Sequence, residues 1–262
     1  MTSSCSHVCA RVCDRMPCMS MGSSAVDERT AKRAESYDEH CPAAKAAAAA
    51  LGAPRLPAQV AEEYRLLHML GRGAYATVYQ ARHKASGDSV AVKVIEKLRP
   101  EGQAGLPDEI AIATSVQHPF IVRCHGYWLE HGRYHMAMDL CTGGDLIDLF
   151  TRHLEKMRLA DPRWQSGFTS GTMLGLLFPM LSSVEYLHRQ GIIHRDVKPD
   201  NFVLQHPGLA SAVMLTDFGL ACRLEHGKTL QRLAGTMLYC APELFRRSYA
   251  HKADVWSLGV TA

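Results

Sequence analysis

The apolar pattern of this 262-residue chain changes character near residue 143. Before that point, short runs rich in β-branched and aromatic residues alternate with glycine turns, a pattern typical of β-strands. These runs are 64–70, 77–83, 89–96, 127–130 and 134–140. After that point, apolar residues recur at spacings of three and four, which predicts a helix through Leu174, Leu177, Leu181, Val184 and Leu187. The sequence therefore predicts an α+β fold with a strand-rich first part and a helical second part.

Composition excludes several classes of function. Hydrophobic residues make up 47% of the chain, enough for a real core, and no apolar run reaches the roughly 18 residues of a membrane span. The net charge of +3 and the isoelectric point near 8.4 lack the concentrated basic character of nucleic-acid-binding proteins. The cysteines beyond residue 41 are scattered, and the N-terminus has no signal-peptide core. We therefore expect an intracellular, cytoplasmic protein without a disulfide framework.

Residues 1–60 differ from the rest of the chain, because they are rich in Ser, Cys, Ala and charged residues. We expect a largely disordered leader there. A helix would place Cys5, Cys9 and Cys13 on one face. A solvated tail is the favoured interpretation, and reversible acylation or a zinc site stays open as an alternative. The folded domain is expected over 64–262.

Two short segments carry the residue types that phosphoryl transfer requires. Residues 194–201 read His-Arg-Asp-Val-Lys-Pro-Asp-Asn, and residues 217–219 read Asp-Phe-Gly. Together they place a candidate proton acceptor, a cation and two oxygen ligands for a metal within 24 residues. Transfer of a phosphoryl group from a nucleotide depends mostly on positioning and charge neutralisation, which such groups supply.

The strand-rich part adds two features that are weak when taken alone. Gly71 and Gly73 lie in a turn between predicted strands, where a backbone without Cβ can close over phosphates, but a plain hairpin turn has the same appearance. Lys93 lies in an apolar strand, and on its own it fits a lysine that snorkels at a sheet edge.

In combination, these motifs resemble those of the serine/threonine protein kinases. The likeness extends to 235–243, which reads Gly-Thr-Met-Leu-Tyr-Cys-Ala-Pro-Glu, and to 254–259, which reads Asp-Val-Trp-Ser-Leu-Gly. Lys198 is typical of the serine/threonine members, and Ala76 resembles the calcium/calmodulin-dependent group. The resemblance implies a two-lobed protein kinase-like fold, with a β-rich N-lobe over about 64–140 and a helical C-lobe over about 141–262. It also implies an incomplete C-lobe, since the family's later helices are absent.

The resemblance further implies a kinase that transfers the γ-phosphoryl group of ATP to protein Ser/Thr hydroxyls. Asp196 would accept or orient the substrate proton, and Lys198 would contact the transferred phosphate. Asn201 and Asp217 would bind Mg²⁺ through oxygen. The implied nucleotide-binding residues are Leu70, Gly71, Gly73, Val78, Ala91, Lys93, Glu109 and Val203. Among them, Glu109 would hold Lys93.

The sequence departs from the family in the helix that carries Glu109. Pro107 lies two residues earlier, with Gly102 and Gly105 just upstream. Proline is tolerated in the first helical turn but not in a helix interior, so we expect a helix that begins near Pro107. Glu109 would then lie in its first turn, and the Lys93–Glu109 pair is expected to be loosely positioned.

Other departures and details concern the helical part. Arg232 occupies the position where related kinases often carry a phosphorylated residue, so activity is expected not to need that phosphorylation. The segment between Asp145 and Asp196 is longer than in the family, and its polar stretch 151–171 predicts a surface loop. Asp254 is expected to brace the backbone of residues 194–201, which form the catalytic loop of the family that the chain resembles.

The expected partners are protein substrates with basic residues before the phosphorylated Ser or Thr, because Asp145 and Asp200 would face such arginines. A helix-start role for Asp145 and a structural role for Asp200 are the other interpretation.

Two further hypotheses remain: a non-catalytic kinase-like binding module, and an inactive fragment that does not fold alone. The second would follow if the helix from residue 254 lacks cover, which predicts weak folding and little activity. The apolar residues of this helix that would lack cover are Val255, Leu258 and Val260.

Overall fold

A computed structural model of the chain describes residues 62–73, 75–95, 108–130, 132–161 and 167–262. The predicted leader over residues 1–60 lies outside the described residues, so its character stays a prediction. None of the helices in the described part of the chain combines the length and apolarity that a membrane crossing requires.

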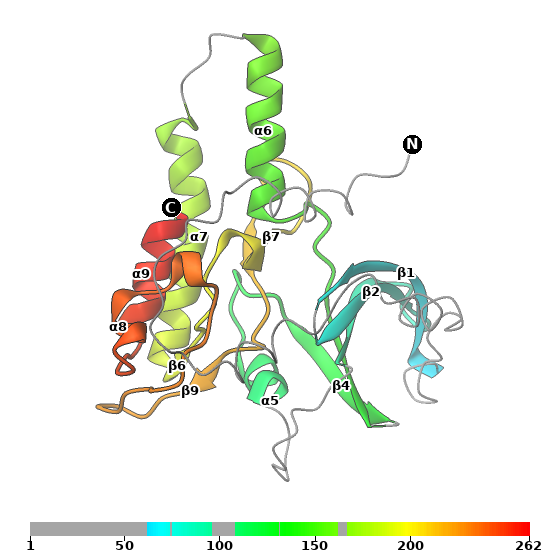
Figure 1. The fold of residues 1–262 in the computed structure, drawn as a ribbon. Helices are drawn as coiled ribbons and strands as arrows, with labels where there is room; N and C mark the ends of the chain where they lie inside the picture. The colour runs from blue at the N-terminus through cyan, green and yellow to red at the C-terminus, as the bar shows by residue number, and fades with distance from the viewer. Residues whose placement is uncertain (1–61, 74, 96–107, 131, 162–166) are drawn as a thin grey trace, which may run out of the picture. The chain divides into compact units, whose positions relative to one another are not determined.

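The strand-rich part folds into one antiparallel sheet with the strand order β1-β2-β3-β5-β4 (Figure 1). Its strands are β1 Tyr64–Arg72, β2 Ala76–His83, β3 Ser89–Ile95, β4 Cys124–Glu130 and β5 Arg133–Asp139. Each coincides with a predicted strand, although β4 begins earlier than its predicted start at residue 127. The sheet forms because alternate side chains along each strand share a face and can be buried together.

The alternation along β3 positions part of the site. Its valines share one face and join a buried cluster: Val90, Val92 and Val94. Ala91 and Lys93 therefore point to the opposite face. In the register of the sheet, Lys93 lies opposite Val78 of β2 and Met136 of β5. Lys93 thus belongs to an inner strand of the sheet, so the interpretation as an edge lysine is wrong.

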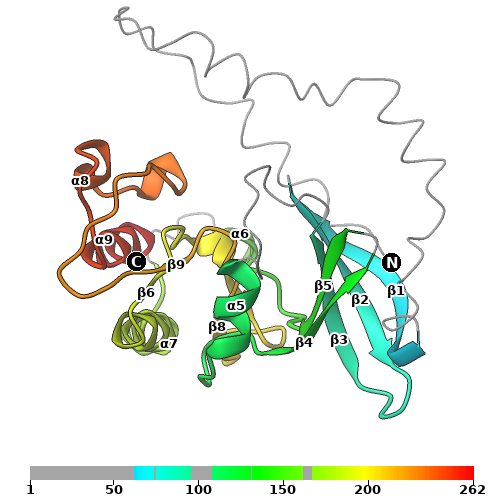
Figure 2. The ribbon, with the colours of Figure 1, turned by 90° about the horizontal axis from the view of Figure 1, so that it is seen from below.

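The second part is mainly helical, with short strands between the helices. The helices are α5 Asp108–Ser115, α6 Leu146–Ala160, α7 Ser170–Arg189, α8 Pro242–Phe245 and α9 Lys252–Thr261. One small antiparallel sheet pairs β6 Ile192–Ile193 with β9 Cys222–Arg223, and another pairs β7 Phe202–Leu204 with β8 Val213–Leu215. Helices α7 and α9 lie side by side in both ribbon views (Figures 1 and 2). One buried apolar cluster joins α5, α7, β7 and β8, and the predicted α+β order is confirmed.

The predicted surface loop over 151–171 is wrong for its first half, which belongs to α6. The Asp145 carboxylate caps this helix by accepting a hydrogen bond from the Asp148 amide at 2.8 Å. Leu146 and Leu149 are buried, while the charged residues further along are exposed. Arg, Glu and Lys favour helices, so a polar composition alone does not distinguish a loop from an exposed helix.

The predicted apolar helix is α7, and its buried face matches the predicted residues only in part. Leu187 is buried as expected, whereas Leu174 is 67% and Leu181 is 54% exposed. Leu176 and Met180 contribute to the core instead. These two residues belong to a neighbouring row of the helix, which apolar periodicity alone does not exclude.

Candidate active site

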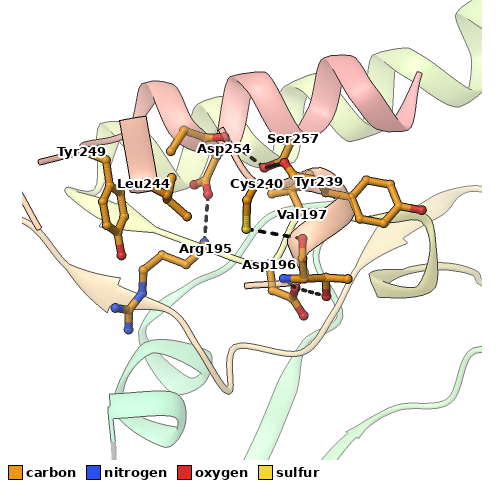
Figure 3. A pocket seen from close by; sticks show the side chains of 11 residues that line it. Arg195, Asp196, Val197, Tyr239, Cys240, Leu244, Tyr249, Asp254 and Ser257 are labelled. Atoms are coloured by element: carbon orange, nitrogen blue, oxygen red, sulfur yellow. Dashed lines mark hydrogen bonds between the residues drawn. The ribbon is translucent and has the colours of Figure 1, made fainter. Parts of the chain in front are cut away.

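A buried carboxylate from α9 holds the backbone of the loop that follows β6. Asp254 is 1% exposed and accepts hydrogen bonds from the amides of His194 and Arg195, each at 2.8 Å. The His188 ring lies 2.9 Å from the same carboxylate. Arg195 has a φ of 67°, a left-handed conformation that persists only where neighbouring groups fix it. The predicted brace is confirmed, because Asp254 fixes the loop immediately before Asp196 (Figure 3).

Asp196 lies at the centre of a cluster of polar side chains. Its Oδ1 accepts hydrogen bonds from the Thr236 amide at 3.0 Å and from the Thr236 hydroxyl at 2.7 Å. Its Oδ2 lies 3.0 Å from the Lys198 ammonium and 3.1 Å from the side-chain nitrogen of Asn201. Lys198 also donates to the Thr236 hydroxyl at 2.9 Å. The structure thus brings three predicted site residues together with Thr236, which lies 40 residues beyond Asp196.

Gly235 permits the close approach of the Thr236 segment to the loop that carries Asp196. Its φ of 112° lies in the region that favours glycine, and a Cβ there would lie 2.4 Å from the carbonyl oxygen of Arg195. On the α9 side, Ser257 donates to the Tyr239 carbonyl at 2.7 Å (Figure 3). A cavity of about 10 Å³ remains between α9 and the loop, room for about one water molecule. Contacts on both sides therefore fix the position of Asp196.

Lys93 binds two carboxylates from separate segments. Its ammonium lies 2.5 Å from Glu109 Oε1 and 2.8 Å from Asp217 Oδ1. The side chains of Lys93 and Glu109 are only 13% and 16% exposed. Helix α5 is described from Asp108, with Glu109 in its first turn as predicted, whereas the predicted start near Pro107 lies outside the described residues and stays a prediction. The expectation of a loosely positioned pair is wrong, because a residue in the first turn of α5 still reaches β3.

The charges of this cluster change both protonation equilibria. Burial acts to lower the pKa of Lys93, but the charges of Asp217 and Glu109 and their hydrogen bonds outweigh burial and raise it. Burial acts to raise the pKa of Asp217, but the Lys93 charge and hydrogen bonds from Lys93 and Gly219 outweigh burial and lower it. Lys93 is therefore cationic and Asp217 anionic at neutral pH.

Four of the predicted nucleotide-binding residues are apolar and lie on strands: Leu70, Val78, Ala91 and Val203. Leu70, in β1, is 38% exposed, whereas Ala91, on the Lys93 face of β3, is buried. Val78 lies opposite Lys93, and Val203 of β7 is half-buried. These strands belong to both the large sheet and the helical part.

The glycines after Leu70 have open surroundings. Within the described residues, a Cβ on Gly71 would meet no heavy atom within 4 Å, and one on Gly73 would meet only the Ala76 carbonyl oxygen at 3.6 Å. Neither glycine has the backbone conformation that only glycine favours. The protein's own packing in the described part therefore does not require glycine at these positions.

Sequence reasoning gave the motifs but missed several of their partners. The motif at 235–243 includes Thr236, but the sequence did not predict that Thr236 contacts Asp196 and Lys198. The Arg195 guanidinium donates through Nε to the Leu220 carbonyl at 2.5 Å, just beyond the Asp-Phe-Gly segment. His188 carries no sequence signal, since a single histidine in an apolar helix has no pattern that marks it.

Comparison with known proteins identifies the family. The family model described as protein kinase domain matches residues 64–262. Serine/threonine-protein kinase H1 of Homo sapiens is 34% identical over 207 residues, which cover 78% of this chain and 46% of that protein. CBL-interacting protein kinase 4 of Oryza sativa subsp. japonica is 37% identical, over 76% of this chain and 43% of that protein. Calcium-dependent protein kinase 5 of Plasmodium berghei (strain Anka) is 30% identical, over 74% and 32%.

The chain spans less than half the length of these curated relatives. The matched region contains the whole antiparallel sheet and both polar clusters, around Asp196 and around Lys93. The names of the relatives agree with the resemblance to the calcium/calmodulin-dependent group. By its motifs, its fold and these similarities, the chain belongs to the protein kinase domain family and is homologous to serine/threonine kinases.

Proposed function

We propose that the chain is an ATP-dependent serine/threonine protein kinase that transfers the γ-phosphoryl group of ATP to protein Ser or Thr hydroxyls. The observation that carries the proposal is the ion-pair cluster in which Lys93 binds both Glu109 and Asp217. A lysine fixed in this way presents positive charge to nucleotide phosphates, and Asp217 beside it offers an oxygen ligand to their metal. Kinase activity depends on having both groups in place together.

The donor atoms near Asp217 fit magnesium. The side-chain nitrogen of Asn201 donates to the Asp196 carbonyl at 2.7 Å, so the Asn201 amide oxygen is the atom that would bind the metal. The Asp217 side chain is 46% exposed and anionic. Mg²⁺ usually binds through one or two carboxylates plus substrate phosphates, and within the described residues no larger His, Cys, Asp or Glu cluster offers a protein-only site. The ion would neutralise charge on the transferred phosphate.

Asp196 is the proposed general base or orienting group for the substrate hydroxyl. Its hydrogen bonds to Thr236 and Asn201 fix the carboxylate in one orientation, as such catalysis requires. Lys198, which lies 3.0 Å from Asp196, would contact the transferred phosphate and stabilise its charge. The Thr236 hydroxyl, which is hydrogen-bonded to both Asp196 and Lys198, would fix these two side chains relative to each other.

The nucleotide would bind between the large sheet and β7. Leu70, Val78 and Ala91 are the proposed contacts on one side of the adenine, and Val203 is the contact on the other. The open space beside Gly71 and Gly73 supports a role for both glycines in closing over the phosphates. Lys93 would then bind the phosphates from β3.

Protein substrates with basic residues before the phosphorylated position are the finer part of the proposal. Asp145 and Asp200 lie close enough for their charges to interact. Burial raises the pKa of Asp145, and the neighbouring charges of Asp148 and Asp200 raise it further. Paired carboxylates suit guanidinium recognition, and an arginine would relieve their repulsion. A peptide library should show a preference for upstream arginine, and Asp200→Asn should weaken it.

Transfer of labelled phosphate from Mg·ATP to a basic Ser peptide tests the proposal. We expect transfer by the wild type, a loss of about 10²–10⁴-fold in Asp196→Asn, and little transfer to a matched Tyr peptide. Thermal unfolding of the same samples separates chemistry from folding. Equal transfer by Asp196→Asn would refute the assignment of Asp196. A cooperatively folded wild type that binds Mg·ATP without transfer would instead support the non-catalytic binding module.

A further inference from the structure

We propose that Arg223 is a positioning residue that holds Glu109 against Lys93 by tying the end of α5 to β9. This inference rests on the proposed function, because Lys93 and Glu109 act there as a pair. Arg223 Nη2 donates to the Ser115 hydroxyl at 2.9 Å, across 108 residues of sequence. Ser115 is the last residue of α5, and Glu109 lies in the first turn of the same helix.

Helix α5 needs such anchors because it is short. It has eight residues, and helices of this length are not stable on their own in water. Glu109 lies in its first turn, where helices fray most readily. The position of the Glu109 carboxylate therefore depends on the contacts that fix the whole helix to the rest of the protein.

The C-terminal end of α5 has specific anchors. The Ser115 hydroxyl accepts from Arg223 and donates to the Ile112 carbonyl at 2.9 Å, so its donor and acceptor roles are both used. The amide of Gln117, just beyond the helix, donates to the Tyr186 hydroxyl of α7 at 3.1 Å. Tyr186 thus ties the segment after α5 to the helical part, whereas Arg223 ties α5 itself to β9.

The backbone of Arg223 is fixed relative to the catalytic loop. Arg223 pairs with Ile192 in the β6–β9 sheet, and β6 leads directly to His194. The next amide, of Leu224, donates to the Gly191 carbonyl at 2.7 Å. Both ribbon views show β9 beside α5 (Figures 1 and 2). Arg223 therefore links the helix that carries Glu109 to the strand that precedes Asp196.

A purely structural role for this bond predicts a different outcome. Arg223 and Ser115 are both exposed, and an exposed hydrogen bond adds little to the stability of a fold. If stability were the only role, loss of the bond would leave kinetics nearly unchanged. A positioning role predicts that kinetics change while global stability does not.

The kinetic test uses variants that remove the bond with little change in volume. We expect Arg223→Met and Ser115→Ala each to lower kcat/KM by about five- to tenfold, in the range of common coupling effects. The double variant should be no worse than either single variant, since both remove one bond. Ser115→Thr, which keeps the hydroxyl, should restore the wild-type value. The matched control is Arg158→Met on α6, an exposed arginine whose replacement should leave kinetics unchanged.

Hydrogen exchange tests the same inference without catalysis. Amides of α5 should exchange faster in Arg223→Met than in the wild type, while those of α9 and those of the Arg158→Met control stay unchanged. Unchanged exchange in α5 would overturn the inference, and so would additive kinetic losses in the double variant. If the wild type transfers no phosphate but amide exchange in α5 rises in Arg223→Met, the proposed function is wrong, and the inference that Arg223 holds α5 is supported.

Discussion

The two faces of α9 differ sharply in what they contact. The inner face is buried and carries Ala253, Asp254, Leu258 and Thr261. On the outer face, Val255 is 54%, Trp256 50% and Val260 48% exposed. A groove of about 420 Å³ lies beside it, between α7 and α9, with exposed Leu181 on its α7 wall. One helix therefore presents a satisfied polar anchor on one side and open apolar residues on the other.

The difference shows which part of α9 supports the site. Asp254 and Ser257 bind backbone groups of the catalytic loop and of the segment after Thr236. The outer residues have no such role in the described part of the chain. The expectation that Val255 and Val260 lack cover is confirmed, whereas the same expectation for Leu258 is wrong, because Leu258 is 4% exposed in the core. Whether the chain folds weakly alone stays a prediction.

The largest effect is expected from Asp254→Ala on the inner face. This change leaves the amides of His194 and Arg195 without their acceptor and removes the partner of His188. Removing one partner from a buried, hydrogen-bonded charge network costs about 3–5 kcal/mol. Urea unfolding should report this loss in the free energy of unfolding, together with loss of phosphate transfer. A loss below about 1 kcal/mol would show that other contacts hold the loop.

A somewhat smaller loss of stability is expected from Lys93→Met. The change leaves Glu109 and Asp217 without their common cation, and the pKa of Asp217 should rise toward and above its usual value. We expect a loss of about 1–3 kcal/mol, mainly the cost of leaving the Glu109 carboxylate, which is only 16% exposed, without a partner, and no detectable phosphate transfer. Undiminished transfer would remove Lys93 from the site. A retained low pKa of Asp217, measured by carboxyl NMR titration, would refute the electrostatic account.

The outer face provides the contrast. Leu181→Gln combined with Val255→Thr should change the free energy of unfolding by no more than about 0.5 kcal/mol, because both side chains are about half exposed. Binding of a hydrophobic dye should fall. The matched control is Leu258→Ala on the inner side, which should cost about 2–5 kcal/mol through cavity formation. Comparable losses in the two variants would mean that the two faces do not differ energetically.

The smallest effect concerns the pH dependence of stability. Burial lowers the pKa of His251, the charge of His188 on α7 adds to this, and Asp254 on α9 acts in the opposite direction. A histidine whose pKa is lower in the folded state binds more protons when unfolded, so stability falls as the pH drops through the unfolded value of about 6.5. Unfolding in urea at about pH 7.5 and about pH 5.5 measures this fall. His251→Gln should reduce it, and an equal fall in that variant would contradict the account.

Most of the fold was predictable from local patterns. The five strands of the large sheet have strong alternation and glycine turns, and they were found with only small errors at their ends. The helix α6 was missed because exposed helices and loops have similar polar compositions. The apolar spacing in α7 correctly included the buried Val184 and Leu187, but it also included Leu174 and Leu181, which are exposed. Burial depends on tertiary packing, which periodicity does not contain.

The site was predictable where residues are close in sequence. Asp196, Lys198 and Asn201 form one motif, and their mutual contacts follow from a short loop. The contact between Arg223 and Ser115 was not predictable, because neither residue belongs to a motif and 108 positions separate them. The formation of the Lys93–Glu109 pair also required the structure, since Pro107 pointed to a weak helix start.

Calorimetric titration of the wild-type chain with Mg·ATP tests the central claim most directly. The claim is that Lys93, Glu109 and Asp217 form an assembled site for the phosphates of a nucleotide and their metal. We predict binding with a dissociation constant between about 1 μM and about 1 mM, the usual range for enzymes and their substrates, and at least tenfold weaker binding without Mg²⁺ or in Asp217→Ala. A cooperatively folded wild type that binds no Mg·ATP, or that binds it equally well in Asp217→Ala, would contradict the claim.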